Sequence, residues 1–318
     1  MEKGEYDFIT IIHKDMNILQ VRNLKKKYGK QIVLNDISFQ LQRGDVLGYI
    51  GPNGSGKTTT IKIICDLIKK DDGEITIYSR EGQKQNIGVV FEGLGLYKRL
   101  TAWENLEFAA KLAGYNENVY KNMILNLLDQ VNLLDVRDKI VKNFSKGMAK
   151  RLSIILAVLH DPTLLILDEP FDGIDTKSHH DLINFLKEWV KEKERAILFT
   201  SHDMADVDAL CNKIAIIDKG KIVEYSDKAS ISIQDELPNI FISLYYPLED
   251  KILKDIKDQY NNLHIINTSL IEVSHHTPAM INKLALDLIN QQQFIKEIYF
   301  DKKSLEDIYL HKIGGNDK

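Results

Sequence analysis

Residues 51–59, Gly-Pro-Asn-Gly-Ser-Gly-Lys-Thr-Thr, are of the types that bind the phosphates of a nucleotide. They fit the pattern G-x-x-x-x-G-K-[ST], whose glycines let successive backbone N–H groups point at phosphate oxygens. Lys57 is expected to reach the β- and γ-phosphates, and the Thr58 hydroxyl to bind Mg²⁺, a cation that prefers oxygen ligands. The sequence therefore predicts ATP and Mg²⁺ as ligands. The expected nucleotide contacts are Gly51, Asn53, Gly54, Ser55, Gly56, Lys57, Thr58 and Thr59.

A second group of candidate residues lies in residues 164–170, where four aliphatic residues lead directly into Asp168, Glu169 and Pro170. Side chains alternate in direction along a strand, so two adjacent carboxylates at its end can take different roles. Asp168 is expected to hold Mg²⁺ through its waters. Glu169 is expected to be catalytic, polarising the water that attacks the γ-phosphate.

The surrounding segments predict the elements that position these residues. Val46–Ile50 is a short apolar run of strand type and residues 59–67 have a helical pattern, so the loop joins a strand to a helix. Ala196–Ser201 is another apolar run. Strands and helical stretches alternate up to about Val223, as expected for a mainly parallel sheet. An antiparallel part is expected to carry Tyr28.

Residues from about 101 to 160 have a mainly helical pattern. Within them, Val119, Met123, Leu127 and Leu128 have the spacing of one buried helix face. We therefore expect a helical subdomain over this range.

Together these residues resemble the nucleotide-binding subunit of an ATP-binding cassette (ABC) transporter. Residues 143–152 are similar to the family's signature motif, in the variant form of drug, bacteriocin and polysaccharide exporters. Ser145 and Gly147 keep their places, whereas Phe144, Lys146 and Met148 depart from the common Leu-Ser-Gly-Gly-Gln. In the family this helix start covers the γ-phosphate bound by the opposite subunit. The resemblance thus assigns nucleotide contacts to Ser145 and Gly147.

The resemblance assigns roles to three further residues. His202, at the end of an apolar strand, matches a catalytic histidine that touches the γ-phosphate and orients the attacking water. Tyr28 matches the aromatic residue on which adenine stacks. Glu92 stands where the family normally has a glutamine that ligates Mg²⁺. It keeps an oxygen ligand but adds a negative charge, which should tighten Mg²⁺ binding.

Other segments also resemble the family. Residues 171–175 are similar to its dimer-contacting loop, and residues 97–105 to the part that faces the membrane partner. Residues 304–310 resemble the tail of exporter ATPases of the daunorubicin-resistance type. The histidine pairs at 179–180 and 275–276 have no such context, so we interpret them as solvated or structural.

Length and composition restrict the possible domain organisation and function of the chain. The chain has 318 residues, enough for one sizeable α/β domain and a smaller one but not for a second cassette. A net charge of −4 gives no basic excess that would favour nucleic acid. Cys65 and Cys211 lack metal or redox spacing, and no secretory signal is seen. No apolar run approaches the roughly 20 residues that span a bilayer.

These observations predict an α/β P-loop NTPase of the ABC ATPase type. We expect a tail over residues 1–15, with Met16 as a possible true start, and a nucleotide-binding domain over residues 16–223 with antiparallel and helical subdomains. A small C-terminal α+β domain would fill residues 224–318, in the order β-α-β-β-α-β of a ferredoxin-like unit. The resemblance implies a cytoplasmic subunit on the inner face of the cell membrane. Its partners would be a separate permease and a second ATPase subunit, identical or different.

Two rival functions remain open at this stage. A soluble ATPase of the same superfamily could act on DNA or ribosomes, although Lys57 and Asp168 lie here in one compact domain without a long coiled coil between them. A regulator that binds ATP without hydrolysing it is hinted at by Glu92 and the altered signature. Glu169 and His202 favour hydrolysis.

Overall fold

The computed structural model describes residues 17–78, 86–91, 95–193, 195–230, 239–260, 262–274, 277–300 and 309. The chain divides into two units, residues 1–227 and 228–318. Several sequence predictions lie outside the described residues: the tail 1–15, Met16, Glu92, the histidine pair 275–276, and residues 304–308 and 310.

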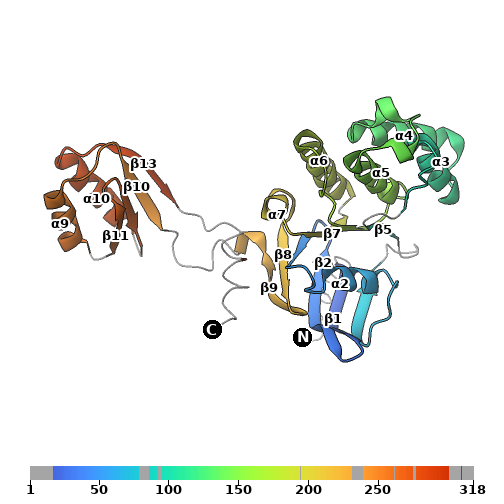
Figure 1. Ribbon diagram of the computed structural model, residues 1–318, viewed down its shortest axis with the longest axis horizontal. Coiled ribbons are helices and arrows are strands. Elements are labelled where there is room, and N and C mark those ends of the chain that lie inside the picture. The colour runs from blue at the N-terminus through green and yellow to red at the C-terminus, as the bar shows by residue number, and fades with distance from the viewer. Residues whose placement is uncertain are drawn as a thin grey trace, which may run out of the picture. The chain divides into compact units, whose positions relative to one another are not determined.

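A six-stranded sheet forms the centre of the first unit, in the order β5-β6-β7-β3-β8-β9 (Figure 1). Its strands are β3 (Val46–Ile50), β5 (Ile87–Val90), β6 (Leu164–Asp168), β7 (Ala196–Ser201), β8 (Lys213–Asp218) and β9 (Lys221–Asp227). All neighbours are parallel except β8 and β9. Strands β3, β6 and β7 are buried along their whole length, because both faces of the sheet are covered. The mainly parallel sheet is as predicted.

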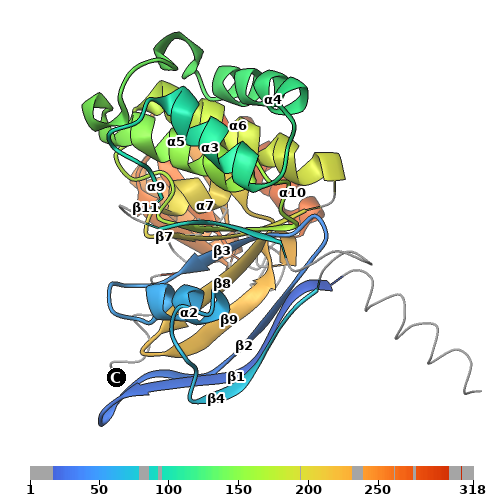
Figure 2. The same cartoon turned by 90° about the vertical axis from the view of Figure 1, so that its right-hand side faces the viewer.

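A second, antiparallel sheet has the order β2-β1-β4. Its strands are β1 (Asn17–Tyr28), β2 (Gln31–Gln42) and β4 (Asp72–Ile77). Helix α2 (Lys57–Ile64) lies between the two sheets, with the remaining helices of the unit beyond the six-stranded sheet (Figure 2). Ile61, Ile63 and Ile64 of α2 join the apolar core that both sheets share. Tyr28 ends β1, so it lies on the antiparallel part as expected.

Helices fill most of the predicted helical range. They are α3 (Ala102–Leu112), α4 (Glu117–Gln130) and α5 (Lys146–Val158), with the 3-10 turns η1 (Leu134–Val136) and η2 (Val141–Asn143) between the last two. The predicted buried face of α4 is confirmed for Leu128, which is fully buried, and is wrong for Val119. Tyr120, Ile124 and Leu128 form the buried face, four residues apart, whereas Val119 is 48% exposed. Met123 and Leu127 border this face half-buried.

Two further helices of the first unit each follow a strand of the six-stranded sheet. Helix α6 (Thr176–Lys193) follows β6, and α7 (Met204–Leu210) follows β7. Within the residues that the structure describes, no helix is long and apolar enough to cross a membrane.

The second unit has the predicted β-α-β-β-α-β order. Its elements are β10 (Ile240–Leu244), α9 (Asp250–Gln259), β11 (Leu263–Asn267), β12 (Leu270–Val273), α10 (Pro278–Asn290) and β13 (Ile295–Phe300). The sheet order is β11-β12-β10-β13, antiparallel throughout, which is the arrangement of a ferredoxin-like unit. Ile242, Ile271 and Leu284 are among the fully buried residues of its own core.

Candidate nucleotide-binding site

The phosphate loop runs from the end of β3 to the start of α2. A Cβ atom at Gly51 would lie 2.2 Å from the carbonyl oxygen of Ile217, so no other residue fits there without displacing β8. Gly56 has φ +114°, and a Cβ atom there would meet Leu34 at 2.6 Å. Both glycines are therefore required by the backbone path of the loop.

Lys57 folds back over this loop. Its ammonium donates to the carbonyl oxygens of Gly51 at 2.6 Å and Pro52 at 3.3 Å. The side chain is buried, and burial lowers the pKa of Lys57, an effect that Glu169 and Asp168 oppose. Ser55 is buried beside it, and its hydroxyl has no hydrogen-bond partner within the described residues.

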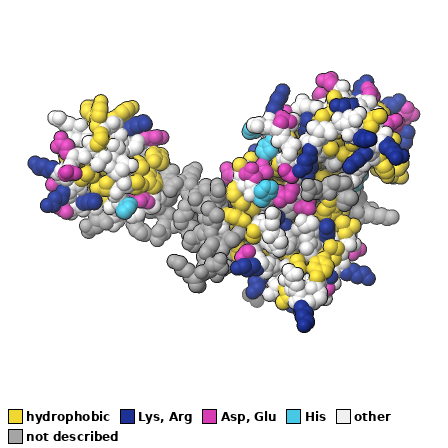
Figure 3. Space-filling view, in the orientation of Figure 1, with side chains coloured by type: hydrophobic (Ala, Val, Ile, Leu, Met, Phe, Trp, Pro, Cys, Tyr) yellow, Lys and Arg dark blue, Asp and Glu magenta, His cyan; other side chains and the backbone are white. Residues whose placement is uncertain are grey.

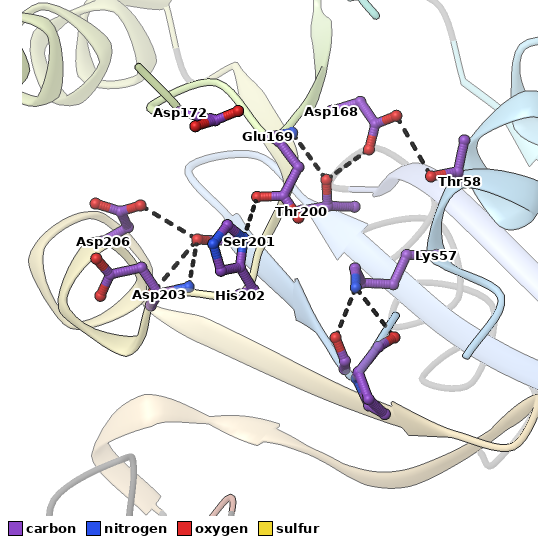
Figure 4. Close-up of polar contacts among 12 residues, drawn as sticks. Lys57, Thr58, Asp168, Glu169, Asp172, Thr200, Ser201, His202, Asp203 and Asp206 are labelled. Atoms are coloured by element: carbon purple, nitrogen blue, oxygen red, sulfur yellow. Dashed lines mark hydrogen bonds and ion pairs between the residues drawn. The ribbon is translucent and has the colours of Figure 1, made fainter. Parts of the chain in front are cut away.

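Oxygen atoms from three elements converge beside the loop (Figure 4). The Thr58 hydroxyl lies 3.4 Å from Oδ2 of Asp168, and the Thr200 hydroxyl donates to Oδ1 of Asp168 at 2.7 Å. A hydroxyl and a buried carboxylate are oxygen donors of the kind that Mg²⁺ prefers. The residues present thus fit a Mg²⁺–nucleotide complex: hard ligands lie beside a glycine loop with an ammonium and an unpartnered buried hydroxyl.

Glu169 follows Asp168 in the left-handed region, at φ 49°, where a residue with a side chain is uncommon. Three contacts hold it. Its N–H donates to the Thr200 hydroxyl at 2.9 Å, and its carbonyl oxygen accepts from the Lys150 ammonium at 2.8 Å. Its carboxylate lies 2.9 Å from Nδ1 of His202. The left-handed turn places Glu169 toward His202, while Asp168 faces Thr58 (Figure 4).

The signature segment begins α5. Ser145 is the N-cap of this helix, and its hydroxyl accepts from the N–H of Met148 at 3.2 Å. A Cβ atom at Gly147 would lie 3.1 Å from the carbonyl oxygen of Gly173, so the helix start is closely packed on residues 171–175. Lys146 forms an ion pair with Asp172 at 2.6 Å. The variant residue Lys146 thereby joins the signature to the predicted dimer-contacting loop.

The structure brings some of the predicted site residues together and leaves others apart. Among the described residues, Thr58 contacts Asp168 and Glu169 contacts His202, whereas no hydrogen bond joins Tyr28, Ser145 or Gly147 to the phosphate loop. Tyr28 is half exposed, with the Lys26 ammonium 5.3 Å from its ring centre. Asn53 and Gly54 are exposed on the loop, and Thr59 is half-buried.

Two residues of the site were not predicted from the sequence. Thr200 binds both Asp168 and Glu169, and Lys150 binds Glu169. A lone threonine within the apolar run of β7 was a signal for the first. No signal in the sequence pointed to Lys150, since it looked like one more charge on a basic helix start.

His179 has a structural role, because it contacts Asp206, whose carboxylate also accepts a hydrogen bond from the Ser201 hydroxyl at 3.2 Å.

Comparisons with known proteins agree with this geometry. The family model described as ABC transporter matches residues 34–172. An uncharacterised ABC transporter ATP-binding protein of Bacillus subtilis, YhcH, is 33% identical, with 93% of this chain and 96% of that protein covered. The bacitracin transport ATP-binding protein BcrA of Bacillus licheniformis is 32% identical, with 94% and 98% covered. The chain belongs to the ATP-binding subunits of ABC transporters.

A solved ATP-binding subunit of an ABC transporter superposes with a TM-score of 0.62 at 30% identity, covering 68% of this chain and 92% of that one. The ABC family binds and hydrolyses ATP, which is the chemistry for which the glycine loop and the paired carboxylates are suited.

Proposed function

We propose that this ABC subunit binds Mg²⁺–ATP at the site described above, dimerises around two ATP molecules and hydrolyses them to drive a separate membrane permease. The observation that carries the proposal is the contact between Glu169 and His202, 2.9 Å apart at the ends of adjacent strands and beside Asp168. Such a pair can bind, orient and deprotonate a water molecule.

Nucleotide binding would use the loop in the conformation seen. Phosphate oxygens would replace the carbonyl oxygens that now accept from Lys57, and the loop N–H groups and the N-terminus of α2 would add further donors. Thr58 and Asp168 would hold Mg²⁺, with Glu92 added from the sequence pattern. When bound, Mg²⁺ supplies positive charge that offsets the charge on the β- and γ-phosphates. Tyr28 would stack on adenine.

The hydrolytic step assigns distinct tasks to Glu169 and His202. A carboxylate can only accept hydrogen bonds, so the Nδ1 atom of His202 must carry the proton shared with Glu169. Nε2 is then the ring nitrogen left for the γ-phosphate, and it would donate a hydrogen bond to a phosphate oxygen only in the doubly protonated ring, since an unprotonated Nε2 can only accept. Glu169 then takes a proton from the attacking water at its carboxylate. Lys57 stabilises the charge that develops on the γ-phosphate.

The second subunit would complete the site. The N-terminus of α5 bears Ser145 and Gly147 and carries the positive end of the helix dipole. An opposing γ-phosphate at this end would be contacted by the Ser145 hydroxyl and the Gly147 N–H. Residues of both subunits are then needed for closure, so loss of the γ-phosphate would release the dimer.

We propose an apolar hollow of about 500 Å³ beside the signature as the seat of the permease. Phe91, Leu96, Val141 and Phe144 are among its lining residues. Tyr97 is exposed next to it and packs edge-on against Phe108, with ring centres 5.3 Å apart. Over α3 and α4, apolar side chains lie between charged ones (Figure 3). The subunit would then lie on the inner face of the cell membrane.

We propose export as the direction of transport. The variant signature resembles that of exporters, and the relative BcrA is by its name a bacitracin transport protein.

The test compares wild-type protein with Glu169→Gln in two assays, phosphate release and ATP binding. Glutamine keeps the shape of the side chain but cannot take the proton, so the variant should bind ATP normally and lose nearly all turnover. It should also accumulate as a dimer when Mg²⁺–ATP is added. Full turnover by the variant would refute Glu169 as the base. Absence of phosphate release from the wild-type protein would favour a regulator that binds ATP without hydrolysing it.

A further inference from the structure

Lys150 connects the signature helix to the catalytic strand end. It lies one turn inside α5, only 8% of its surface is exposed, and its ammonium donates to the main-chain oxygen of Glu169 at 2.8 Å. Desolvating an ammonium is unfavourable, so a buried lysine needs strong acceptors in fixed positions. The Glu169 carbonyl is such an acceptor, and this contact spans from one subdomain to another.

The carbonyl that Lys150 holds belongs to the strained residue of the site. Glu169 has φ 49°, and residues in this region persist only when their surroundings fix them. Thr200 holds the N–H of Glu169 and Lys150 holds its carbonyl, so the two peptide groups that flank the side chain are both anchored. The side chain is thereby directed to His202. Releasing one anchor would let the peptide rotate and move the carboxylate.

The same helix presents the signature residues at its start. Ser145 caps α5, Gly147 packs on residues 171–175, and Lys150 follows on the next turn. A displacement of α5 toward or away from β6 must therefore change the Lys150 contact. If Ser145 meets the ATP of the opposite subunit, the position of α5 depends on that ATP.

We infer that Lys150 is a positioning residue for hydrolysis, which sets the orientation of the base Glu169 according to the placement of the signature helix. This inference rests on the proposed function, because it takes Glu169 as the base. It adds a link within one subunit between the end of α5 that meets one ATP and the base that acts on the other.

The test uses Lys150→Met in the full chain, because methionine fills similar space without a donor. A misplacement of about 1 Å can cost about 100-fold in rate. We expect kcat to fall about 10- to 100-fold, with the KM for ATP within about twofold of wild type. Lys150→Arg keeps a cationic donor and should recover most of the lost turnover. The control is Lys121→Met on α4, a lysine that is half exposed and paired with Glu117, which should keep wild-type turnover.

A double variant shows whether Lys150 acts through Glu169. Adding Lys150→Met to Glu169→Gln should leave the residual single-turnover rate unchanged, since the base is already lost. Two results would overturn this inference while leaving the proposed function in place. One is a further 10-fold loss of the single-turnover rate when Lys150→Met is added to Glu169→Gln. The other is a wild-type kcat for Lys150→Met when Glu169→Gln is inactive. Full turnover by Glu169→Gln would overturn the proposed function first. If Lys150→Met melts below the assay temperature, Lys150→Leu, which also lacks a donor, replaces it with the same expectations for the double variant.

Discussion

Replacing Thr200 with valine should disturb stability and catalysis together. Thr200 is fully buried in β7, and its hydroxyl donates to Asp168 at 2.7 Å and accepts from the Glu169 N–H at 2.9 Å. Valine has nearly the same shape, so the change removes the hydroxyl and leaves packing intact. The Asp168 carboxylate, which is itself buried, and the Glu169 N–H then each lose a partner.

The expected magnitude follows from these two hydrogen bonds. A bond to a charged group contributes about 1.5–3 kcal/mol and a neutral one about 1 kcal/mol. The free energy of unfolding of the first unit should therefore fall by about 3 kcal/mol. Turnover should fall at least about 10-fold, because both the proposed metal ligand Asp168 and the proposed base Glu169 lose an anchor. Thr163→Val is the matched control, since Thr163 is also buried but its hydroxyl makes a longer hydrogen bond, 3.4 Å, to the uncharged carbonyl oxygen of Asn86.

Tryptophan fluorescence during urea denaturation measures this change for the first unit alone. The chain has two tryptophans, Trp103 and Trp189, and both lie in the first unit. The midpoint should shift to a lower urea concentration for Thr200→Val. For the Thr163→Val control, the free energy of unfolding should stay within about 1 kcal/mol of the wild-type value. An unchanged midpoint with wild-type turnover for Thr200→Val would refute the role given to this hydroxyl.

Three further predictions concern other parts of the chain. Burial raises the pKa of Asp161, but hydrogen bonds from Lys193 and Arg195 outweigh this effect and lower the pKa below its ordinary value. The ionised Asp161 therefore stabilises the fold above the unfolded-state pKa, and this stabilisation is lost as pH falls through the folded-state pKa. Asp161→Asn should therefore lower the free energy of unfolding by about 2 kcal/mol at pH 7 but by clearly less near pH 3, and an equal effect at both would contradict the pairing. Burial raises the pKa of the Cys65 thiol to about 12, so iodoacetamide at pH 8 should label Cys65 slowly in the native protein and quickly in urea, as mass spectrometry would show. Glu92→Gln should retain ATPase activity with a changed Mg²⁺ dependence, and identical Mg²⁺ titrations of both proteins would rule this out.

The sequence predicted the elements whose signals are local. The run Val46–Ile50 and the run Ala196–Ser201 are strands as expected, because uninterrupted apolar residues suit a sheet covered on both faces. The β-α-β-β-α-β order of the second unit was also visible, since each element there has its own period. Helix α4 shows the limit of this approach. Its apolar residues occupy more than one face, so only the packed structure selects Tyr120 rather than Val119 for the core.

The parts that could not be predicted depend on distant residues meeting. Glu169 was identified from its neighbours in the chain, but its left-handed conformation arises from Thr200 and Lys150, which are 31 and 19 residues away. Lys150 in particular can reach the carbonyl oxygen of Glu169 only when α5 lies against the end of β6. The proposed contacts with a second subunit and with a permease involve other chains, so they follow from the family resemblance and not from the residue pattern of this chain alone.

The most direct test of the central claim is to tag this protein in its own cell, solubilise the membranes gently and identify what co-purifies. We expect a hydrophobic protein with several membrane spans in stoichiometric amount, whose recovery depends on the exposed Tyr97 and the apolar hollow beside the signature. Recovery of ribosomes or DNA, or of no partner at all, would contradict a role in driving a permease.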